Sequence, residues 1–191
     1  GMIHSYPSVY ALGHWAVKDI LLDPVIVQEK VDGSQISFGW YATDVGLILR
    51  IRSKGAELQV LAPEKMFAAG ITAIQAVEDK LEPGWVYRGE YLAKTKHNAL
   101  GYGRIPQNHI AVFDIEVDVQ AFMPPDRVRV EAERLGFEVV PTLRQGMLAS
   151  VEDFRTLLET PSFIGGLKVE GVVVKNYARF GLDKKVLMAK Y

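Results

Sequence analysis

The stretch PVIVQEKVDGS, residues 24–34, joins a β-branched run to a turn signal. Valine and isoleucine favour extended backbone, so residues 24–30 are expected to form a strand. Asp32-Gly33 is a strong turn signal, and it ends this strand just after Lys30. The junction therefore predicts a lysine at the end of a strand, where its amine lies near solvent.

Two more strand patterns follow the junction. Residues 34–40 alternate between apolar and polar side chains, and GLILRIR at 46–52 is a second β-branched run. With turns at Asp32-Gly33 and around 44–46, the three runs predict a meander. Further strands are expected at Trp85–Leu92, His109–Val117, Glu138–Pro141, Val169–Lys175 and Lys185–Lys190.

Three helical patterns interrupt the strands. Glu64–Leu81 repeats apolar side chains at helical spacing, Asp126–Leu135 starts after a Pro-Pro pair, and Ser150–Leu158 opens with Ser-x-x-Asp, a variant of the capping box. The pattern indicates an α+β fold, with a β-rich core and helices packed outside it. The chain shows no repeat, low-complexity segment or linker, so residues 1–191 are expected to form a single domain.

Composition narrows the classes of function. The chain is 49% hydrophobic and 24% charged, with a net charge of −1 and no cysteine. These values fit a soluble protein with a sizeable core and exclude disulfides and thiolate metal sites. No apolar run approaches the ~20 residues of a membrane span, and no signal-peptide pattern opens the chain, so we expect a cytoplasmic protein. Basic residues outnumber acidic ones from Lys168 onward, which suits a phosphate-bearing ligand or a solvated polar end.

Lys30 is the first candidate for chemistry. A lysine at such a junction can attack phosphorus when its amine is neutral and in line with the leaving group. The Lys-x-Asp-Gly pattern alone is weak, because a hairpin with an exposed lysine fits it equally well. Five further clusters follow it in order: RIRSKG at 50–55, YRGEY at 87–91, FDIE at 113–116, VEGVVVK at 169–175 and VLMAK at 186–190.

These clusters carry cations and carboxylates within predicted strands or at their ends. Arginine forks and lysine point charges suit phosphate oxygens. Their order resembles that of the covalent nucleotidyltransferase superfamily of ligases and mRNA capping enzymes, and most closely the ATP-dependent RNA ligases. The resemblance implies a nucleotidyltransferase (ATP-grasp-like) domain, with antiparallel sheets flanking a nucleotide cleft and helices outside. It also implies the activity. AMP would pass from ATP to a lysine and then to an RNA 5′-phosphate. A 3′-hydroxyl end would finally attack and join the two strands.

The resemblance assigns roles to residues. The lysine that carries AMP would be Lys30, and two further catalytic lysines would be Lys175 and Lys190, the latter on the α-phosphate. Glu170 would lie near the metal, Mg²⁺ with Mn²⁺ as an alternative. The residues expected to bind ATP are Glu29 (adenine amino group), Asp32, Gly33, Arg52 or Lys54 (ribose or phosphate), Glu90 (ribose) and Phe113 (adenine stacking).

Several alternatives stay open. Met188 stands where many members carry the first lysine of a Lys-x-Lys pair. Alternation puts Phe113 on one face with Ile115 and Val117, so core packing is the alternative to stacking. The stretch 94–104 suits an RNA backbone or a flexible solvated loop. Arg88 and Arg104 are expected to be surface charges or substrate contacts, and His14 and His97 lack partners at metal-ligand spacing.

Two other functions compete with an RNA ligase. Residues 34–38 lack the arginine that DNA ligases and capping enzymes carry shortly after Lys-x-Asp-Gly, which favours RNA over DNA. A small DNA ligase core is nevertheless the rival within enzymes. A non-catalytic module that binds ATP or RNA on the same fold is the rival from another class.

Overall fold

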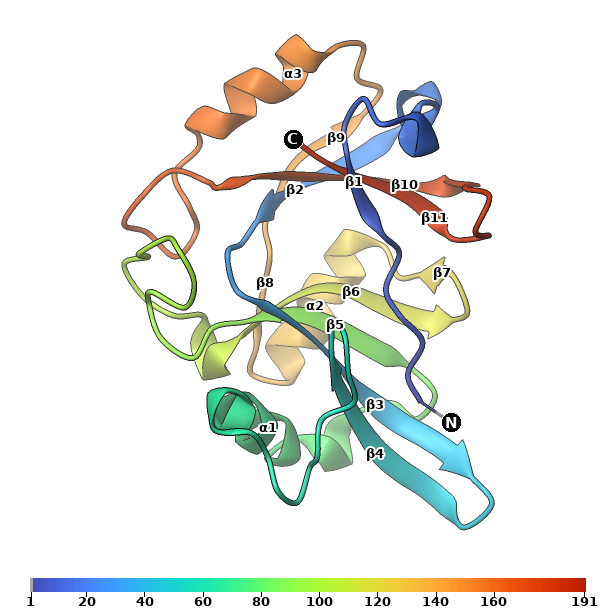
Figure 1. Cartoon of the computed structure of the whole chain (residues 1–191), viewed down its shortest axis with the longest axis vertical. Helices are drawn as coiled ribbons and strands as arrows, with labels where there is room; N and C mark the ends of the chain where they lie inside the picture. The colour runs from blue at the N-terminus through green and yellow to red at the C-terminus, as the bar shows by residue number, and fades with distance from the viewer. Residues whose placement is uncertain (1) are drawn as a thin grey trace. The chain divides into compact units, whose positions relative to one another are not determined.

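A computed structural model describes residues 2–191, which form two β-sheets, three short α-helices and several 3-10 helices (Figure 1). The chain divides into two compact units that alternate along the sequence. Unit 1 comprises the segment up to Ser5 and Asp32–Val139, and unit 2 comprises Tyr6–Val31 and Val140–Tyr191. Within residues 2–191, every helix is too short or too polar to span a bilayer.

Unit 2 contains a five-stranded sheet. Its strand order is β1 (Val9–Ala11), β11 (Val186–Lys190), β10 (Gly171–Phe180), β2 (Val25–Lys30) and β9 (Thr142–Gly146). β1 and β11 are parallel, and the other neighbours are antiparallel. Alternate residues of β2 and β10, such as Val27 and Val174, are fully buried in the core of this unit with Phe154 of α3 (Val151–Arg155). The opposite face of the sheet is therefore available for polar side chains.

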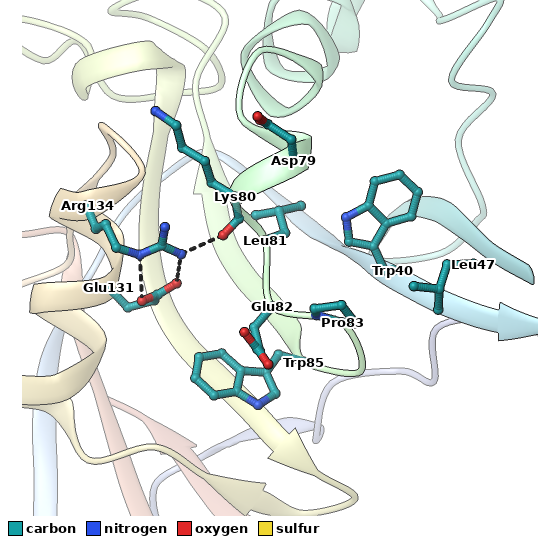
Figure 2. Close-up of a pocket in the computed structure, with 10 residues that line it drawn as sticks. All are labelled: Trp40, Leu47, Asp79, Lys80, Leu81, Glu82, Pro83, Trp85, Glu131 and Arg134. Atoms are coloured by element: carbon teal, nitrogen blue, oxygen red, sulfur yellow. Dashed lines mark hydrogen bonds and ion pairs between the residues drawn. The ribbon is translucent and has the colours of Figure 1, made fainter.

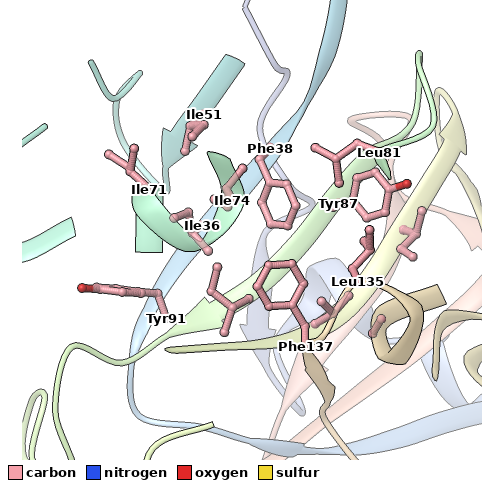
Figure 3. Close-up of a cluster of buried hydrophobic side chains, with 14 of the residues drawn as sticks. Ile36, Phe38, Ile51, Ile71, Ile74, Leu81, Tyr87, Tyr91, Leu135 and Phe137 are labelled. Carbon is pink, nitrogen blue, oxygen red and sulfur yellow. The ribbon is translucent and has the colours of Figure 1, made fainter. Parts of the chain in front are cut away.

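Unit 1 contains a six-stranded sheet. Its order is β4 (Gly46–Ser53), β3 (Ser34–Thr43), β5 (Val86–Tyr91), β6 (Ile110–Asp118) and β7 (Ala121–Phe122), with β8 (Glu138–Val139) parallel to β6. Phe38, Tyr87 and Phe137 form the aromatic centre of its core (Figure 3). The helices α1 (Ala68–Gln75) and α2 (Pro125–Arg134) contribute Ile71, Ile74, Val128 and Ala132 to the same cluster.

The 3-10 helices are single turns that connect these elements. They are η1 (Trp15–Val17), η2 (Ile20–Leu22), η3 (Lys65–Phe67), η4 (Glu78–Lys80), η5 (Gln107–His109) and η6 (Thr156–Glu159). The helix expected over 64–81 is consequently broken into η3, α1 and η4. Val77 leaves helical geometry at φ −121° and ends α1 early.

The α+β class is confirmed, and both sheets are mixed because each contains one parallel pair. The predicted meander is wrong at its first turn. β2 and β3 do not pair: β2 belongs to the five-stranded sheet and β3 to the six-stranded one, whereas β3 and β4 do form a hairpin. At Asp32-Gly33 the chain therefore leaves the five-stranded sheet and enters the six-stranded one. A Cβ at Gly33 would lie 2.5 Å from the Tyr91 carbonyl oxygen, so close approach to β5 explains the glycine.

Two further predictions need adjustment at their ends. β10 continues to Phe180, five residues beyond the predicted strand end. The helix predicted from Ser150 is α3 followed by η6, and its start is confirmed: Asp153 Oδ2 accepts hydrogen bonds from the backbone N–H groups of Ala149 and Ser150. β1, β7 and β9 have no strand-like pattern long enough to predict.

Candidate active site

Lys30 is the last residue of β2 and pairs with Gly171 of β10. Val25 and Val27 point into the core of unit 2, so alternation places Lys30 on the opposite face. Its ammonium donates to both oxygens of Glu170, at 3.0 and 3.2 Å, and both side chains are about one-third exposed. A Cβ at Gly171 would lie 2.7 Å from the Tyr191 carbonyl oxygen. Glycine is therefore needed beside Lys30.

Lys175 and Lys190 share the face of Lys30. Core residues Val174 and Ala189 alternate with them on β10 and β11, and Lys190 pairs with Val173. Lys175 is buried, and its Nζ lies 5.9 Å from the ring centroid of Tyr6, where a cation–π attraction is effective. Lys190 is exposed. One face of this sheet therefore carries all three lysines predicted to act in catalysis.

Gln28 lies on the same face and went unnoticed in the sequence. Its side chain is 3% exposed, and its Oε1 has no hydrogen-bond partner among the described residues. A buried acceptor without a partner costs free energy unless a ligand or water satisfies it. Its position two residues before Lys30 places this buried acceptor on the same face as the lysine.

Glu29 points to the opposite face from Lys30. Its oxygens accept hydrogen bonds from Ser162 Oγ at 2.6 Å and from the Phe163 N–H at 3.0 Å. Burial raises the pKa of Glu29, and these two hydrogen bonds offset that rise only in part. A carboxylate has further lone pairs, so an adenine amino group could still donate to it. No local pattern reveals Ser162, because its contact with Glu29 spans 133 residues of sequence.

In unit 1, the Asp32–Ser34 turn is held by the loop that follows β5. The Asp32 N–H donates to Tyr102 Oη at 2.8 Å, and Asp32 Oδ2 accepts from the N–H groups of Ala99 and Leu100, both at 2.9 Å. The stretch 94–104 is therefore anchored to the turn by hydrogen bonds, although most of its residues are exposed to solvent. Its RNA contact stays a prediction.

Glu90 also contacts this turn. It lies on β5, on the face opposite Tyr87 and Tyr91, and its Oε2 accepts a hydrogen bond from the Gly33 N–H at 3.2 Å. The structure brings together Asp32, Gly33 and Glu90, three of the residues predicted to bind ATP. The half-buried carboxylate of Glu90 retains acceptor capacity for a sugar hydroxyl.

Phe113 lies at a β-bulge. Arg88 pairs with Asp114 and Gly89 with Val112, so Phe113 is the extra residue of β6. The bulge puts Val112 and Ile115 in the core together, whereas Phe113 is half-buried and outside the core cluster. The predicted shared face of Phe113 and Ile115 is wrong, because a bulge breaks the alternation. A bulge that re-aims an aromatic ring is compatible with base stacking.

The cations of β4 are largely engaged within unit 1. Three guanidinium N–H groups of Arg52 donate to the carbonyl oxygens of Ser53, Ile3 and Lys54, and Arg50 pairs with Glu57 at 3.1 Å. Lys54 is exposed. Of the two residues predicted to contact ribose or phosphate, Lys54 has the more accessible charge.

Arg88 is fully buried, so its prediction as a surface charge or substrate contact is wrong. Its guanidinium donates to Glu116 Oε1 at 2.7 and 3.0 Å, to Ser37 Oγ and to the His4 carbonyl oxygen. Burial acts to raise the pKa of Glu116, but the hydrogen bond from His4 and the charge of Arg88 outweigh it and hold the pKa below its usual value. This network ties the N-terminal segment to the sheet. Arg104 lies at the surface, as expected, and pairs with Glu138.

The carboxylates of these residues do not form a preformed metal cluster among the residues that the structure describes. Over residues 2–191, no three His, Cys, Asp or Glu side chains group as metal ligands. A hollow of about 700 Å³ in unit 1 is lined by Trp40, Trp85 and the Arg134–Glu131 pair (Figure 2). None of the predicted site residues lines it. A metal at Glu170 would therefore need water and substrate oxygens as its other ligands.

The fold matches that of solved RNA ligase structures. The structure of an RNA ligase from Naegleria gruberi with pyrophosphate matches with a TM-score of 0.69 at 18% identity, covering 100% of this chain and 58% of that one. A variant of that ligase with ATP and manganese matches with a TM-score of 0.67 at 19% identity, over 98% of this chain and 55% of that one. The chain thus spans little more than half the length of these proteins.

The sequence model of the RNA ligase family matches residues 23–191. The chain belongs to the RNA ligase family. A comparison with curated protein sequences finds no match. At such low identity the solved structures establish the fold alone, so the role of each site residue is a matter for proposal.

Proposed function

We propose that this chain is the adenylylating catalytic domain of an ATP-dependent RNA ligase. One observation carries the proposal: Lys30, Lys175 and Lys190 share one face of the five-stranded sheet, and Lys30 ends β2 in contact with Glu170. A nucleophilic amine with further cations beside it suits attack on a phosphate. Membership of the RNA ligase family supports the same reaction.

The first step exchanges one bond to phosphorus for another. The Lys30 Nζ, once neutral, attacks the α-phosphorus of ATP, an N–P bond forms, and the bond to the bridging oxygen breaks to release pyrophosphate. The amine proton passes to solvent. Charge develops on the phosphate oxygens, so positioning and cationic stabilisation dominate catalysis. Lys190 and Lys175 would supply that stabilisation. AMP would then pass to an RNA 5′-phosphate, and a 3′-hydroxyl end would displace it.

A divalent cation fits the oxygen donors on this face. Glu170 offers a carboxylate, and the unpartnered Oε1 of Gln28 offers an amide oxygen, directly or through water. Magnesium requires only one or two carboxylates and keeps several waters, and manganese accepts the same ligands. When bound, the metal would neutralise phosphate charge. Structures of variants of the Naegleria enzyme contain manganese together with ATP or with AMP.

Several of the residues described above would recognise the nucleotide. We assign the adenine amino group to Glu29, the ribose to Glu90 and base stacking to Phe113. Asp32 and Gly33 form the turn next to Lys30 in sequence, and Lys54, or Arg52, would contact ribose or phosphate. A cytoplasmic location also belongs to this proposal.

The direct test is the intact mass of the protein after incubation with ATP and Mg²⁺ or Mn²⁺. We expect a mass gain of one AMP, absent in Lys30→Ala and retained in Lys168→Ala, whose exposed lysine pairs with Glu159. No adduct in the wild-type protein would favour a non-catalytic module that binds ATP or RNA. If an adduct forms, nicked duplexes with RNA or DNA at the 3′-hydroxyl side distinguish an RNA ligase from a DNA ligase.

A further inference from the structure

The loop of residues 93–104 surrounds the Asp32–Ser34 turn with hydrogen bonds. Tyr102 Oη accepts from the Asp32 N–H, and Asn98 Nδ2 donates to the Gly33 carbonyl oxygen at 2.8 Å. His97 Nε2 contacts Ser34 Oγ at 2.8 Å. Each residue of the turn is thus bound by a different side chain of the loop.

His97 adopts one tautomer here. Its Nδ1 accepts a hydrogen bond from the Ala93 N–H at 3.0 Å, so in the neutral ring the proton lies on Nε2, which donates to Ser34 Oγ. His97 thereby connects the start of the loop to the end of the turn. Burial lowers the pKa of His97, which favours the neutral form that these two contacts require.

The Asp32 carboxylate is bound within this network. Oδ2 accepts from two successive backbone N–H groups, those of Ala99 and Leu100, in the way that a carboxylate organises a tight loop. The contact is reciprocal, because the loop holds the Asp32 backbone through Tyr102 while Asp32 holds the loop backbone. Tyr102 is 6% exposed, so its hydroxyl contact is shielded from water.

We propose that loop 93–104 is a positioning element for adenylylation, with Tyr102, Asn98 and His97 as positioning residues. This inference rests on the proposed function and deepens it. The loop fixes the backbone that leaves Lys30 and the Gly33 N–H that binds Glu90. Asp32 then acts mainly through the loop, rather than by touching the nucleotide. None of the three positioning residues is among those assigned to ATP binding.

Small displacements of this turn are expected to lower the rate of adenylylation more than they lower the affinity for ATP. Misplacement of reacting groups by about 1 Å can cost on the order of 100-fold in rate. Tyr102→Phe removes the hydroxyl that accepts from Asp32, and Asn98→Ala removes the amide that donates to Gly33. Asn98 is exposed, so its truncation leaves the core intact even where Tyr102→Phe would disturb it.

The test is the single-turnover rate of Lys30–AMP formation at saturating ATP, with the ATP concentration for half-maximal rate and the melting temperature measured in parallel. We expect each variant to lose about tenfold or more in rate. Half-saturation should move less than about twofold, because ATP contacts are unchanged. Tyr41→Phe, which removes a hydroxyl bonded to the Met2 carbonyl oxygen, and Thr95→Ala on the exposed side of the loop should keep the wild-type rate.

A wild-type rate in both Tyr102→Phe and Asn98→Ala would overturn the inference while leaving the proposed function intact. The inference would also be overturned if Tyr102→Phe lost rate only together with a lower melting temperature while Asn98→Ala kept the wild-type rate. If the wild-type protein forms no adduct, the proposed function fails and this inference falls with it.

Discussion

Lys30 and Glu170 form a two-point contact in the free protein, in which one ammonium donates to both oxygens of one carboxylate. The amine cannot attack phosphorus while it is held in this way, because its lone pair carries a proton. Release requires that Glu170 take another partner. A divalent cation is the natural competitor for the carboxylate, and it would arrive with the phosphates of ATP.

Glu170→Gln should therefore slow adenylylation by about 100-fold or more, since it removes the anionic ligand while keeping the side-chain shape. The pair is one-third exposed, so its loss should change the free energy of unfolding by at most about 1 kcal/mol. The measurement is single-turnover labelling with α-phosphate-labelled ATP. Glu159→Gln, at an exposed ion pair with Lys168, is the matched control. Near-normal labelling by Glu170→Gln would remove Glu170 from the metal site.

Phe113→Ala should weaken ATP binding without a core-sized loss of stability. Stacking on a base contributes ~1–3 kcal/mol, whereas truncating a fully buried phenylalanine costs ~3–5 kcal/mol. Phe38, fully buried in the core of unit 1, is the matched control. Melting temperatures with and without ATP separate the two effects. If Phe113→Ala loses as much stability without nucleotide as Phe38→Ala does, Phe113 is a packing residue.

The bulge at Phe113 is a feature that the sequence did not predict. Alternation predicted the strand correctly but assigned Phe113 and Ile115 to the same face, because a bulge has no local signature in this run. The Asp32-Gly33 pattern likewise predicts a hairpin turn, which the structure does not contain. A turn signal specifies a change of direction, but the next strand's partner depends on contacts far away in sequence, here with Tyr91.

Ordered motifs were the most informative part of the sequence. They placed Lys30, Lys175 and Lys190 on strands whose pairing brings them to one face. The side chains that support the site could not be predicted, because each acts through a long-range contact. Ser162 binds Glu29 across 133 residues, and Tyr102 binds Asp32 across 70.

His97 should make stability depend on pH in a defined direction. Its folded-state pKa is lowered, chiefly by burial and further by Lys94, against the opposing charge of Asp32. The unfolded state then binds the proton more readily. The contribution of His97 is therefore present above about pH 6.5 and is lost as the pH falls toward the lower folded pKa.

Urea unfolding at about pH 7.5 and about pH 5.5 tests this direction. The wild-type protein should lose more free energy of unfolding on acidification than His97→Gln, which cannot be protonated. His14→Gln, at an exposed imidazole that caps η1, controls for general histidine effects. Equal losses in wild type and His97→Gln would mean that the His97 ring does not need to be neutral in the folded protein.

Strand joining by this 191-residue chain depends on how many phosphate contacts it can make with RNA. Phosphate contacts dominate nucleic-acid affinity, yet the net charge is −1 and many exposed arginines are already paired with carboxylates. Those pairs are Arg104–Glu138, Arg129–Glu133, Arg134–Glu131, Arg155–Glu152 and Arg179–Asp23. Lys94 and Lys96, exposed on loop 93–104, are the cations best placed to meet an RNA backbone near the turn. With so few contacts, sealing should be weak.

We therefore expect the chain to charge itself with AMP readily but to seal nicks slowly, with sealing that falls further as salt rises. Single-turnover sealing by pre-adenylylated protein, at low and at physiological salt, measures this directly. Lys94→Ala with Lys96→Ala should reduce sealing further and lower the salt slope by about 1 per lysine. The exposed pair Lys18→Ala with Lys65→Ala should leave the slope unchanged. Fast sealing that is indifferent to salt would show that this chain holds RNA ends through contacts other than these cations.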